Sequence, residues 1–523
     1  MKSPADFYKE KFDRYSSKLT GISLKVKRFA WYRLISFAAI FLPLALLGWQ
    51  WLTLPLSILL VVFFFFLIKK NIQLEKQKQK FSVLKKIVED EQLALNHSFL
   101  HFQNGKEYLD TEHFFSYDLD LFGDGSIFQF LNRTSTISGR QKLAGWLIAP
   151  PKEKQFIDSR QIAIQELSLI PIWRLHFLAN GRLFEETEVL SKEIRSWSEM
   201  ELELNRPELV KKLILLIPAI TVISILPAIL GLSNVFLILM VFTQFVLMYF
   251  FWKRINQYFS FFGRKSELLG KYMQLLEFIE EREFRSEYFV ELQKKVKAPS
   301  ASKIFKQMKS LVKEFEYRQN ILVGVVLNGL FLWDIRCVYK LWKWHRKHHK
   351  RLSIWIEVIS EMDALISLGN YAYNNPGFAY PKIHNEGFSF EAKELGHPLL
   401  HPDKRVNNNM QINGWSKAMI GTGANMAGKS TFLRTVGVNL ILARLGAPVC
   451  AEQMRTTPIE IYTNMRTTDS LLKDESYFFA ELKRIKGVLD KLRSGERIFV
   501  ILDEMLKGTN SIDKLNGSKE LIR

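Results

Sequence analysis

Residues 423–430, GANMAGKS, have the spacing of a phosphate-binding loop, G-x-x-x-x-G-K-[ST]. In such a loop the glycines let backbone N–H groups turn inward around a phosphate, and the following helix adds its positive N-terminal dipole. The Lys429 ammonium would reach the β- and γ-phosphates, and the Ser430 hydroxyl would ligate Mg²⁺. The pattern therefore predicts ATP and Mg²⁺ as cofactors. The residues expected to surround the nucleotide are Gly423, Ala424, Asn425, Met426, Ala427, Gly428, Lys429, Ser430 and Thr431.

Two acids supply the second part of such a site. Asp503 and Glu504 end an apolar segment, IFVILDE, and Asp503 lies 74 residues after Lys429. We expect Asp503 to complete the Mg²⁺ shell with Ser430. Glu504 would polarise the attacking water as a general base, so Glu504 and Lys429 are the predicted catalytic residues. A strand end with two exposed acids is the alternative, and the upstream loop disfavours it.

Regular elements must hold these residues in place. An apolar segment at 416–423, SKAMIGTG, is expected to form a strand that runs into the loop, and an apolar helix follows until Gly446. A second helix is expected at 476–492 and a buried strand at 497–505, RIFVILDEM. Ser476 precedes the second helix, where helix capping alone would explain it. This order of elements is typical of an α/β domain with a parallel sheet.

Two long segments without charge predict membrane hairpins. Residues 34–68 and 213–252 contain 35 and 40 residues without a charged side chain. Each segment is too long for one span of about 20 residues and suits two spans. Lysine and arginine flank both segments at their outer ends and are absent from their turns, which places the outer ends in the cytoplasm. We therefore expect a multi-pass membrane protein with four spans, membrane lipid as a partner, and soluble parts and both termini in the cytoplasm.

The charge balance leaves the partner open. The chain of 523 residues carries a formal net charge of +20, which favours nucleic acid or anionic lipid, although part of this charge flanks the hairpins. The basic segment at 343–351, KWHRKHHKR, would either contact phosphates or form a solvated helix face. No acid or base lies within the two uncharged segments, which argues against a transporter. Cys337 and Cys450 are expected to be reduced, buried thiols.

Shorter stretches complete the domain scheme. An apolar segment of 13 residues at 321–333 is too short to span a membrane and predicts a buried helix of a soluble domain. The segments KAPSAS (297–302) and NNPGFAYP (374–381) predict a turn and a domain boundary. The expected division is a cytoplasmic N-terminal segment 1–28, a hairpin 29–70, a helical connector 71–104, a first core part 105–210, a second hairpin 211–252, a helical lever and core part 253–375, and a P-loop ATPase domain 376–523.

Several motifs together resemble the MutS family of DNA mismatch-repair ATPases. The segments that carry the resemblance are TGANMAGKST (422–431) with its Asn425–Met426 pair, SYFFAEL (476–482), DEMLKGTNSIDK (503–514), GHPLL (396–400), SEMDALISLGNYA (360–372) and SIFQFLNRTSTISGRQKLAGWLIAPP (126–151). The resemblance implies a fold of the α plus α/β class, with an all-helical lever and core region followed by an ABC-type P-loop NTPase domain. It also implies that Ser476 acts catalytically on the ATP of a partner subunit, in a homodimer whose ATP cycle moves helical levers.

Parts of the chain depart from that family's pattern. One hairpin stands where mismatch-repair members carry their mismatch-reading domain, and the other stands where the levers would carry the DNA clamp. Ala424 replaces the usual proline of the loop, and Leu506 and Lys507 replace a Gly-Arg pair. The sequence ends at Arg523, without the family's later strand and His-bearing switch. We therefore expect a C-terminally incomplete ATPase domain, whose activity depends on the missing part and on dimerisation.

Two functions follow from these patterns. The first is a MutS-like protein that binds and hydrolyses ATP and binds mismatched or branched DNA in mismatch repair. The alternative is a membrane-anchored motor ATPase that acts on a membrane protein or lipid without mismatch recognition. A salt-dependent affinity for DNA would distinguish the two, because contacts with phosphates weaken as salt rises.

Overall fold

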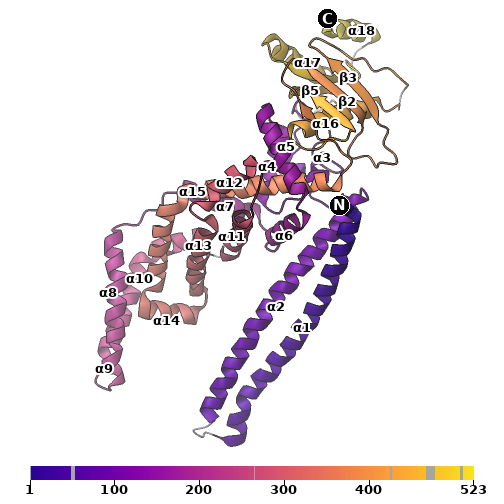
Figure 1. Cartoon of the computed structure of the whole chain (residues 1–523). Coiled ribbons are helices and arrows are strands. Elements are labelled where there is room, and N and C mark those ends of the chain that lie inside the picture. Colours follow the sequence, from indigo (N-terminus) through magenta and orange to yellow (C-terminus); the bar gives the residue numbers. More distant parts are fainter. Residues whose placement is uncertain are drawn as a thin grey trace. The chain divides into compact units, whose positions relative to one another are not determined.

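The computed structural model describes residues 2–48, 53–263, 265–424, 427–466, 477–506 and 510–522. Internal contacts divide the chain into two compact units. The first unit comprises Met1–Thr134, Lys142–Leu183 and Ala364–Arg523, and the second comprises Ser135–Gln141 and Phe184–Asp363. Figure 1 labels the helices and strands of both units.

The first unit begins with a hairpin of two long helices that lie side by side (Figure 1). These are α1 (Pro4–Leu47) and α2 (Thr53–Leu95). Near the start of α1 the Tyr8 side chain is buried, and its hydroxyl donates to the Asn374 side chain at 2.9 Å. Toward the turn the hairpin is apolar and exposed, as at Leu46 and Phe65. The hairpin expected at 29–70 is thus one part of two helices that continue into the packed core of this unit.

Short helices and buried polar contacts fill the middle of the first unit. The elements are η1 (Lys106–Tyr108), α3 (Ile127–Leu131), α4 (Ile137–Ile148, shared with the second unit), α5 (Lys154–Ser168) and α6 (Pro171–Arg182). The buried Arg133 guanidinium pairs with Glu91 of α2 at 2.6 Å. The backbone N–H of Arg133 donates to the Ser367 hydroxyl of α15 (Trp333–Asn374) at 3.0 Å. These contacts join α2, the turn after α3 and the end of α15 into one core.

The C-terminal part of the first unit contains two small sheets. Its elements are β1 (Lys382–Ile383), β2 (Ser389–Leu395), β3 (Asn408–Asn413), α16 (Lys429–Arg444), β4 (Gln453–Thr456), β5 (Glu460–Asn464), α17 (Tyr477–Arg493), β6 (Ile498–Leu502) and α18 (Ser511–Ile522). One sheet has the strand order β1-β4-β2-β3, in which β1 and β4 are parallel and β2 is antiparallel to both of its neighbours. The other is the parallel pair β5-β6, with Asn464 opposite Leu502.

The elements around the expected site agree with the sequence apart from one strand. Helix α16 ends just before Gly446, which has a positive φ of 75°, and α17 and β6 lie where a helix and a strand were expected. The strand expected at 416–423 is wrong, because this segment is irregular and exposed. Neither described sheet contains a strand that pairs with residues 416–423. A segment without hydrogen-bonded neighbours cannot form part of a sheet. The expected parallel sheet is likewise limited to two strand pairs.

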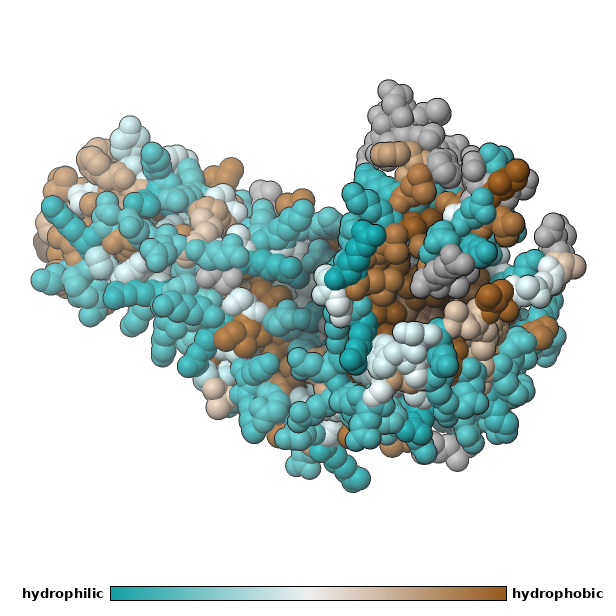
Figure 2. Space-filling model, turned by 90° about the horizontal axis from the view of Figure 1, so that it is seen from above, coloured by the Kyte–Doolittle hydropathy of each residue, from teal (hydrophilic) through white to brown (hydrophobic). Residues whose placement is uncertain are grey.

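Apolar side chains reach the surface in this C-terminal part. In the view from above, brown side chains gather within a rim of teal ones on the end that carries α17 and α18 (Figure 2). The exposed apolar side chains include Trp415, Met419, Ile420, Phe479 and Leu482.

Helix α16 differs from this surface, since its residues from Thr435 to Arg444 are all buried. The helix that follows the loop is therefore the central element of this part.

The second unit is helical throughout its described residues. Its elements are α7 (Glu188–Glu199), α8 (Pro207–Ile223), α9 (Ile225–Ile229), α10 (Val235–Phe262), α11 (Ser266–Glu281), α12 (Glu287–Lys297), α13 (Ala301–Glu316), η2 (Tyr317–Gln319), α14 (Ile321–Phe331) and most of α15. The turn predicted at 297–302 separates α12 from α13. The cations of the basic segment 343–351 are exposed on α15, whereas its Trp344 and His345 are buried. Cys337, and Cys450 in the first unit, are buried free thiols, as expected.

Three helices among the described residues are long and apolar enough to cross a membrane. They are α2, the pair α8–α9 (Pro207–Ile229) and α10. The number rises to five if each of two sharply bent pairs, α5–α6 and α14–α15, counts as one span. Span-length apolar helices therefore occupy three of the four expected places, and α1 occupies the fourth.

The third apolar segment contradicts the sequence-based expectation. A helix does form there, α14, but Ile321 and Leu322 are each 79% exposed, and Val326 is 56% exposed. Only Gly324, Asn328 and Gly329 of this helix are buried. The length of this segment does not decide whether its side chains find partners inside the protein. The expected buried helix of a soluble domain is thus an exposed apolar helix.

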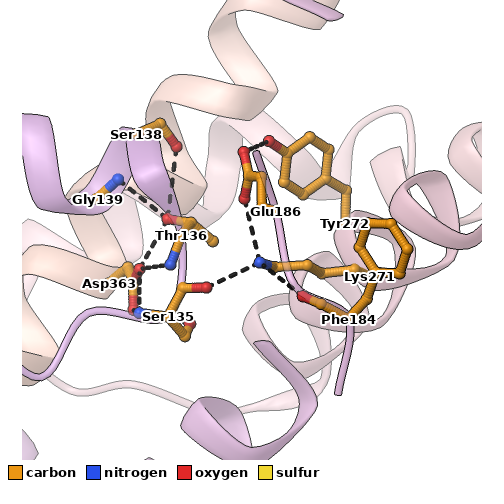
Figure 3. A network of polar contacts seen from close by, with 9 residues as sticks. All are labelled: Ser135, Thr136, Ser138, Gly139, Phe184, Glu186, Lys271, Tyr272 and Asp363. Atoms are coloured by element: carbon orange, nitrogen blue, oxygen red, sulfur yellow. Dashed lines mark hydrogen bonds and ion pairs between the residues drawn. The ribbon is translucent and has the colours of Figure 1, made fainter. Parts of the chain in front are cut away.

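Asp363, the last residue of α15 that belongs to the second unit, binds the start of α4. The buried Asp363 carboxylate accepts hydrogen bonds from the backbone N–H groups of Ser135 and Thr136, at 2.9 and 2.8 Å, and from both hydroxyls (Figure 3). These donors include groups that α4 leaves unpaired at its N-terminus. A Cβ atom added to Gly139 would lie 2.4 Å from the Asp363 carboxylate, so only glycine fits there.

A buried ion pair continues this network. The Lys271 ammonium of α11 donates to the Ser135 carbonyl at 2.8 Å and pairs with the Glu186 carboxylate at 3.1 Å (Figure 3). The Tyr272 hydroxyl donates to the other oxygen of Glu186 at 2.7 Å. Both members of the ion pair are buried, and buried charges persist only when they are paired and hydrogen-bonded. The network therefore holds α11, α4 and α15 together within this unit.

Candidate nucleotide-binding site

The loop leads into α16 through a glycine with left-handed backbone geometry. Gly428 has φ +82° and ψ +14°, a conformation that costs other residues energy and glycine almost none. Helix α16 begins directly after Gly428, at Lys429, so the unpaired backbone N–H groups of its first turn face the loop. The Lys429 ammonium donates to the carbonyl oxygens of Gly423 and Ala424, at 2.6 and 3.3 Å. The lysine thus lies over the loop, within reach of a phosphate bound there.

The predicted metal ligands are brought together. The Ser430 hydroxyl, in the first turn of α16, donates to the Asp503 carboxylate at 2.5 Å. Asp503 directly follows β6, and its backbone N–H donates to the Asn464 carbonyl at the end of β5 at 3.0 Å. The parallel pair β5-β6 therefore positions the carboxylate, and α16 positions the hydroxyl. Ser430 and Asp503, which are 73 positions apart in the sequence, are thus in direct contact.

These two oxygen ligands suit Mg²⁺. Magnesium prefers hard oxygen donors and usually binds through one or two protein groups, with waters and substrate phosphates in its remaining positions. A hydroxyl and a carboxylate that already touch satisfy this requirement. Among the described residues no group of three or more His, Cys, Asp or Glu side chains could hold a metal by itself. The donor set therefore fits a metal that is shared with a nucleotide.

The second acid, Glu504, lies on a turn with unusual backbone geometry. Its φ is +48°, and that of Leu506 is +56°, which are positive values that non-glycine residues rarely adopt. The Leu506 backbone N–H donates to the Glu481 carboxylate of α17 at 2.5 Å, and Glu481 is buried. The Glu504 side chain is exposed and directly follows Asp503 in the chain. Helix α17 thus holds the turn that presents the predicted general base.

Glu481 was missed by the sequence analysis, although a signal was present. Glu481, Ile485 and Val488 follow the spacing of one helix face, and all three are buried. A carboxylate on the apolar face of a helix needs a partner inside the protein. The expectation for the segment SYFFAEL concerns only Ser476, although the position of Glu481 on this face already indicates such a partner.

A segment that precedes α3 also joins the site. The fully buried Asp118 carboxylate accepts hydrogen bonds from the Thr463 hydroxyl at 2.6 Å and from the backbone N–H groups of Met465 and Arg466, at 3.2 and 3.0 Å. The Arg484 guanidinium of α17 lies 3.3 Å from the same carboxylate. Asp118 therefore binds the chain where it leaves β5 and neutralises a cation of α17.

The same segment contacts the helix that follows the loop. Arg434 of α16 donates through Nε to the Asp118 carbonyl at 3.0 Å and lies 3.6 Å from the Asp120 carboxylate. A Cβ atom added to Gly437 would lie 2.6 Å from Leu119, so this glycine lets the segment pack against α16. Residues 118–120 thus touch α16, the end of β5 and α17. They form a link between the helical core of the first unit and the loop helix.

A histidine lies beside this link. His397 is buried, and its Nδ1 accepts from the Leu399 backbone N–H at 3.3 Å. The pKa of His397 is lowered to about 4, chiefly by burial and also by the positive charge of Arg434, while Asp120 opposes the shift. His397 is therefore neutral at physiological pH and adds no positive charge beside Arg434.

Three predicted site residues lie outside the described residues. They are Asn425, Met426 and Ser476. The remaining ones are placed: Gly423, Ala424, Ala427, Gly428, Lys429, Ser430 and Thr431 form the loop and the first turn of α16, and Asp503 and Glu504 follow β6. The loop and both acids are named in the sequence analysis, and the supporting residues Asp118, Asp120 and Glu481 are not.

Comparison with known proteins adds independent evidence for this region. Residues 419–521 match the family model MutS domain V. The chain is 34% identical over 170 residues to the DNA mismatch repair protein MutS of Persephonella marina (strain DSM 14350 / EX-H1), an alignment that covers 32% of this chain and 19% of that protein. It is 29% identical over 205 residues to the DNA mismatch repair protein Msh6 of Gallus gallus, which covers 36% of this chain and 15% of that protein.

Each alignment covers only a part of this chain and only a part of the relative. The aligned part of the chain spans a fifth or less of the length of the curated relatives it matches. The family model lies wholly within the C-terminal part of the first unit, where the loop and both acids are found. The comparisons therefore support the MutS family through this domain, and both hairpins lie outside the family match.

Proposed function

We propose that this chain is a MutS-like ATPase that binds and hydrolyses ATP with Mg²⁺ and acts in a process related to DNA mismatch repair. The observation that carries the proposal is the contact between the Ser430 hydroxyl and the Asp503 carboxylate, made beside a loop that Lys429 covers. The similarity of residues 419–521 to MutS domain V supports the same reading.

The residues of the chain have separate roles in the proposed reaction. Lys429 binds the phosphates, and Ser430 and Asp503 hold Mg²⁺, which when bound neutralises phosphate charge. The Glu504 carboxylate orients the attacking water and accepts its proton. Glu481 positions the turn that carries Glu504 through its hydrogen bond from Leu506. In this scheme Ser476 contacts the ATP of a partner subunit.

DNA and a second copy of this chain are the proposed partners. Two relatives are named DNA mismatch repair proteins, and the net charge of +20 suits a polyanion. Pairing of two copies would complete each site through Ser476, and the exposed apolar side chains of the C-terminal part are suitable for such a contact. ATP-driven pairing would then move the helical levers.

Membrane anchoring is proposed for both hairpins. Helices α2, α8–α9 and α10 are long and apolar enough to cross a bilayer, and their apolar windows are at most 11% buried. Exposed apolar helices of this length are unfavourable in water and favourable in lipid. The soluble parts and both termini would lie in the cytoplasm. Membrane anchoring is also compatible with the alternative function. In that alternative the protein is a motor that acts on a membrane protein or lipid, without mismatch recognition.

One set of assays on the full chain in lipid nanodiscs tests the proposal. We expect Mg²⁺-dependent ATP binding that Lys429→Ala abolishes and that Lys417→Ala, an exposed lysine before the loop, leaves intact. We also expect salt-dependent binding to mismatched or branched duplex in preference to matched duplex. ATP binding that persists in Lys429→Ala would refute the nucleotide site. Intact ATP binding without any DNA binding at low salt would refute the DNA partner and leave the membrane motor.

A further inference from the structure

Helix α14 presents an apolar face that has no partner within the described residues of its unit. It contains no charged residue, and its outward side chains are apolar. Those side chains are Ile321, Leu322, Val323, Val325 and Val326, which are between 40% and 79% exposed. Eleven residues at about 1.5 Å each make the helix roughly 17 Å long, which is too short to cross a bilayer.

The opposite face of α14 packs on the second hairpin. A Cβ atom added to Gly329 would lie 3.4 Å from Phe245 and 3.5 Å from Val241, both of α10. Val241 and Phe245 lie well inside the uncharged segment 213–252. The exposed face of α14 therefore continues the exposed apolar surface of α10, at the depth of its uncharged part.

Buried side chains of the hairpin contact the C-terminal end of α14. Leu332, which ends the helix with φ +48°, donates its backbone N–H to the Gln244 side chain of α10 at 2.9 Å. The Gln244 amide donates in turn to the Thr221 hydroxyl of α8 at 2.7 Å. Gln244 and Thr221 are fully buried. Such contacts suit a helix end at membrane depth, because irregular backbone is tolerated there only where protein groups replace water.

The residues before and after α14 lie close together. Arg318, before the helix, lies 3.3 Å from the Asp334 carboxylate after it, and both side chains are largely buried. The Arg318 guanidinium also lies over the Phe259 ring at 4.9 Å and the Trp252 ring at 5.8 Å. Trp252 ends the uncharged segment of α10, where an interfacial aromatic residue is expected. The chain therefore enters and leaves the apolar region beside the same end of α10.

From this geometry we infer that α14 is a re-entrant membrane helix. It inserts into one leaflet beside α8 and α10, with its exposed face against the acyl chains, and returns to the side from which it came. The inference rests on the proposed membrane anchoring of the second hairpin. It gives that unit a third membrane element, joined directly to α15.

Spin labels at single cysteines in phosphatidylcholine–phosphatidylglycerol vesicles test the inference. Cys337 and Cys450 are first replaced by alanine, and labels are then placed through Leu322→Cys and Val326→Cys on α14. Phe242→Cys on α10 serves as the hairpin reference, and Val189→Cys, an exposed apolar position on α7, as the control outside the hairpin. We expect the α14 labels to resemble Phe242→Cys, with collisions with oxygen several-fold more frequent, relative to a water-soluble nickel complex, than at Val189→Cys.

The outcomes separate the inference from its premise. Labels on α14 that resemble Val189→Cys, while Phe242→Cys reports lipid, would overturn the re-entrant helix and keep the anchored hairpin. A Phe242→Cys label that also reports water would overturn both. Gln244→Leu removes the side-chain acceptor of the Leu332 N–H and leaves it only the Asn328 carbonyl at 3.3 Å, so we expect the Val326→Cys label to become more mobile while Phe242→Cys is unchanged. Unchanged mobility of the Val326→Cys label would show that Gln244 does not hold the helix end.

Discussion

The Glu481 carboxylate of α17 accepts a hydrogen bond from the backbone N–H of Leu506 at 2.5 Å. Leu506 lies two residues after Glu504, and both have a positive φ. Such a turn is retained where its surroundings hold it. The geometry of the proposed general base therefore depends on a second acid, which lies on α17.

Glu504→Gln is expected to separate ATP binding from hydrolysis. The amide keeps the size of the side chain but cannot accept a proton, so turnover should fall by roughly 10²- to 10⁴-fold, as for other lost general bases. ATP binding should persist, because Lys429 and Ser430 are unchanged. Steady-state ATPase rates and nucleotide binding by the same preparation measure both. Glu496→Gln, which alters an acid paired with Lys491, is the control, and unchanged turnover in Glu504→Gln would remove this residue from the role of base.

Glu481→Ala should slow turnover while Glu481→Gln should nearly preserve it. The alanine leaves the Leu506 N–H without its acceptor, whereas the glutamine oxygen can still accept. We expect about a tenfold fall in kcat for the alanine variant, with little change in KM, because the loop itself is untouched. Equal kcat values for the two variants would argue against a positioning role.

Asp118→Asn should destabilise the protein. The carboxylate receives three hydrogen bonds at the end of β5 and faces Arg484, so its loss leaves a partly buried cation without its counter-charge. A cost of about 2–4 kcal/mol is expected, which thermal unfolding would report as a lower Tm. Asp124→Asn, an exposed aspartate that accepts from Asn104, is the control and should change the Tm little. A similar Tm for both variants would contradict the proposed link.

Gly139→Ala should be destabilising where Gly145→Ala is not. The new Cβ at residue 139 would lie 2.4 Å from the Asp363 carboxylate, and the clash should cost about 1–3 kcal/mol. Gly145 lies on the same helix with nothing within 4 Å of its Cβ position, so alanine there should be neutral or stabilise by up to about 1 kcal/mol. Thermal unfolding compares the two variants. Equal midpoints would show that the contact between α4 and α15 is looser than described.

His397 should make the protein sensitive to mild acid. Its pKa is about 4 in the folded chain, below the unfolded value of about 6.5, so the unfolded chain takes up the proton first as the pH falls. Stability is therefore unaffected above about pH 6.5 and is lost progressively down to about pH 4. Between about pH 7.5 and pH 5 this group should cost roughly 2 kcal/mol. His397→Asn keeps an acceptor for the Leu399 N–H and does not titrate, so its Tm should fall less than the wild-type Tm over this range.

The sequence by itself determined the local parts of the proposed site. The spacing of the glycines, Lys429 and Ser430 predicted the loop, and the apolar run before Asp503 predicted the strand that carries the acids. These features are readable because periodicity and turn residues act over a few neighbours. The two uncharged segments likewise predicted long apolar helices.

The strand ahead of the loop and the environment of α14 could not be read in this way. A strand forms only if another segment supplies its hydrogen bonds, and residues 416–423 have no such neighbour among the described strands. The apolar composition of α14 is compatible with a core or with a lipid surface. Its exposure follows from which of its faces meets α10.

Only the tertiary structure decided what supports the proposed catalytic groups. Asp118 reaches Thr463 and Arg484 across more than 340 residues of chain, and Glu481 reaches Leu506 from another element. No local pattern specifies such partners, because they depend on which helix face packs on which strand end. The sequence thus determined which residues are proposed to bind a nucleotide, and the packing of distant segments determined how those residues are held.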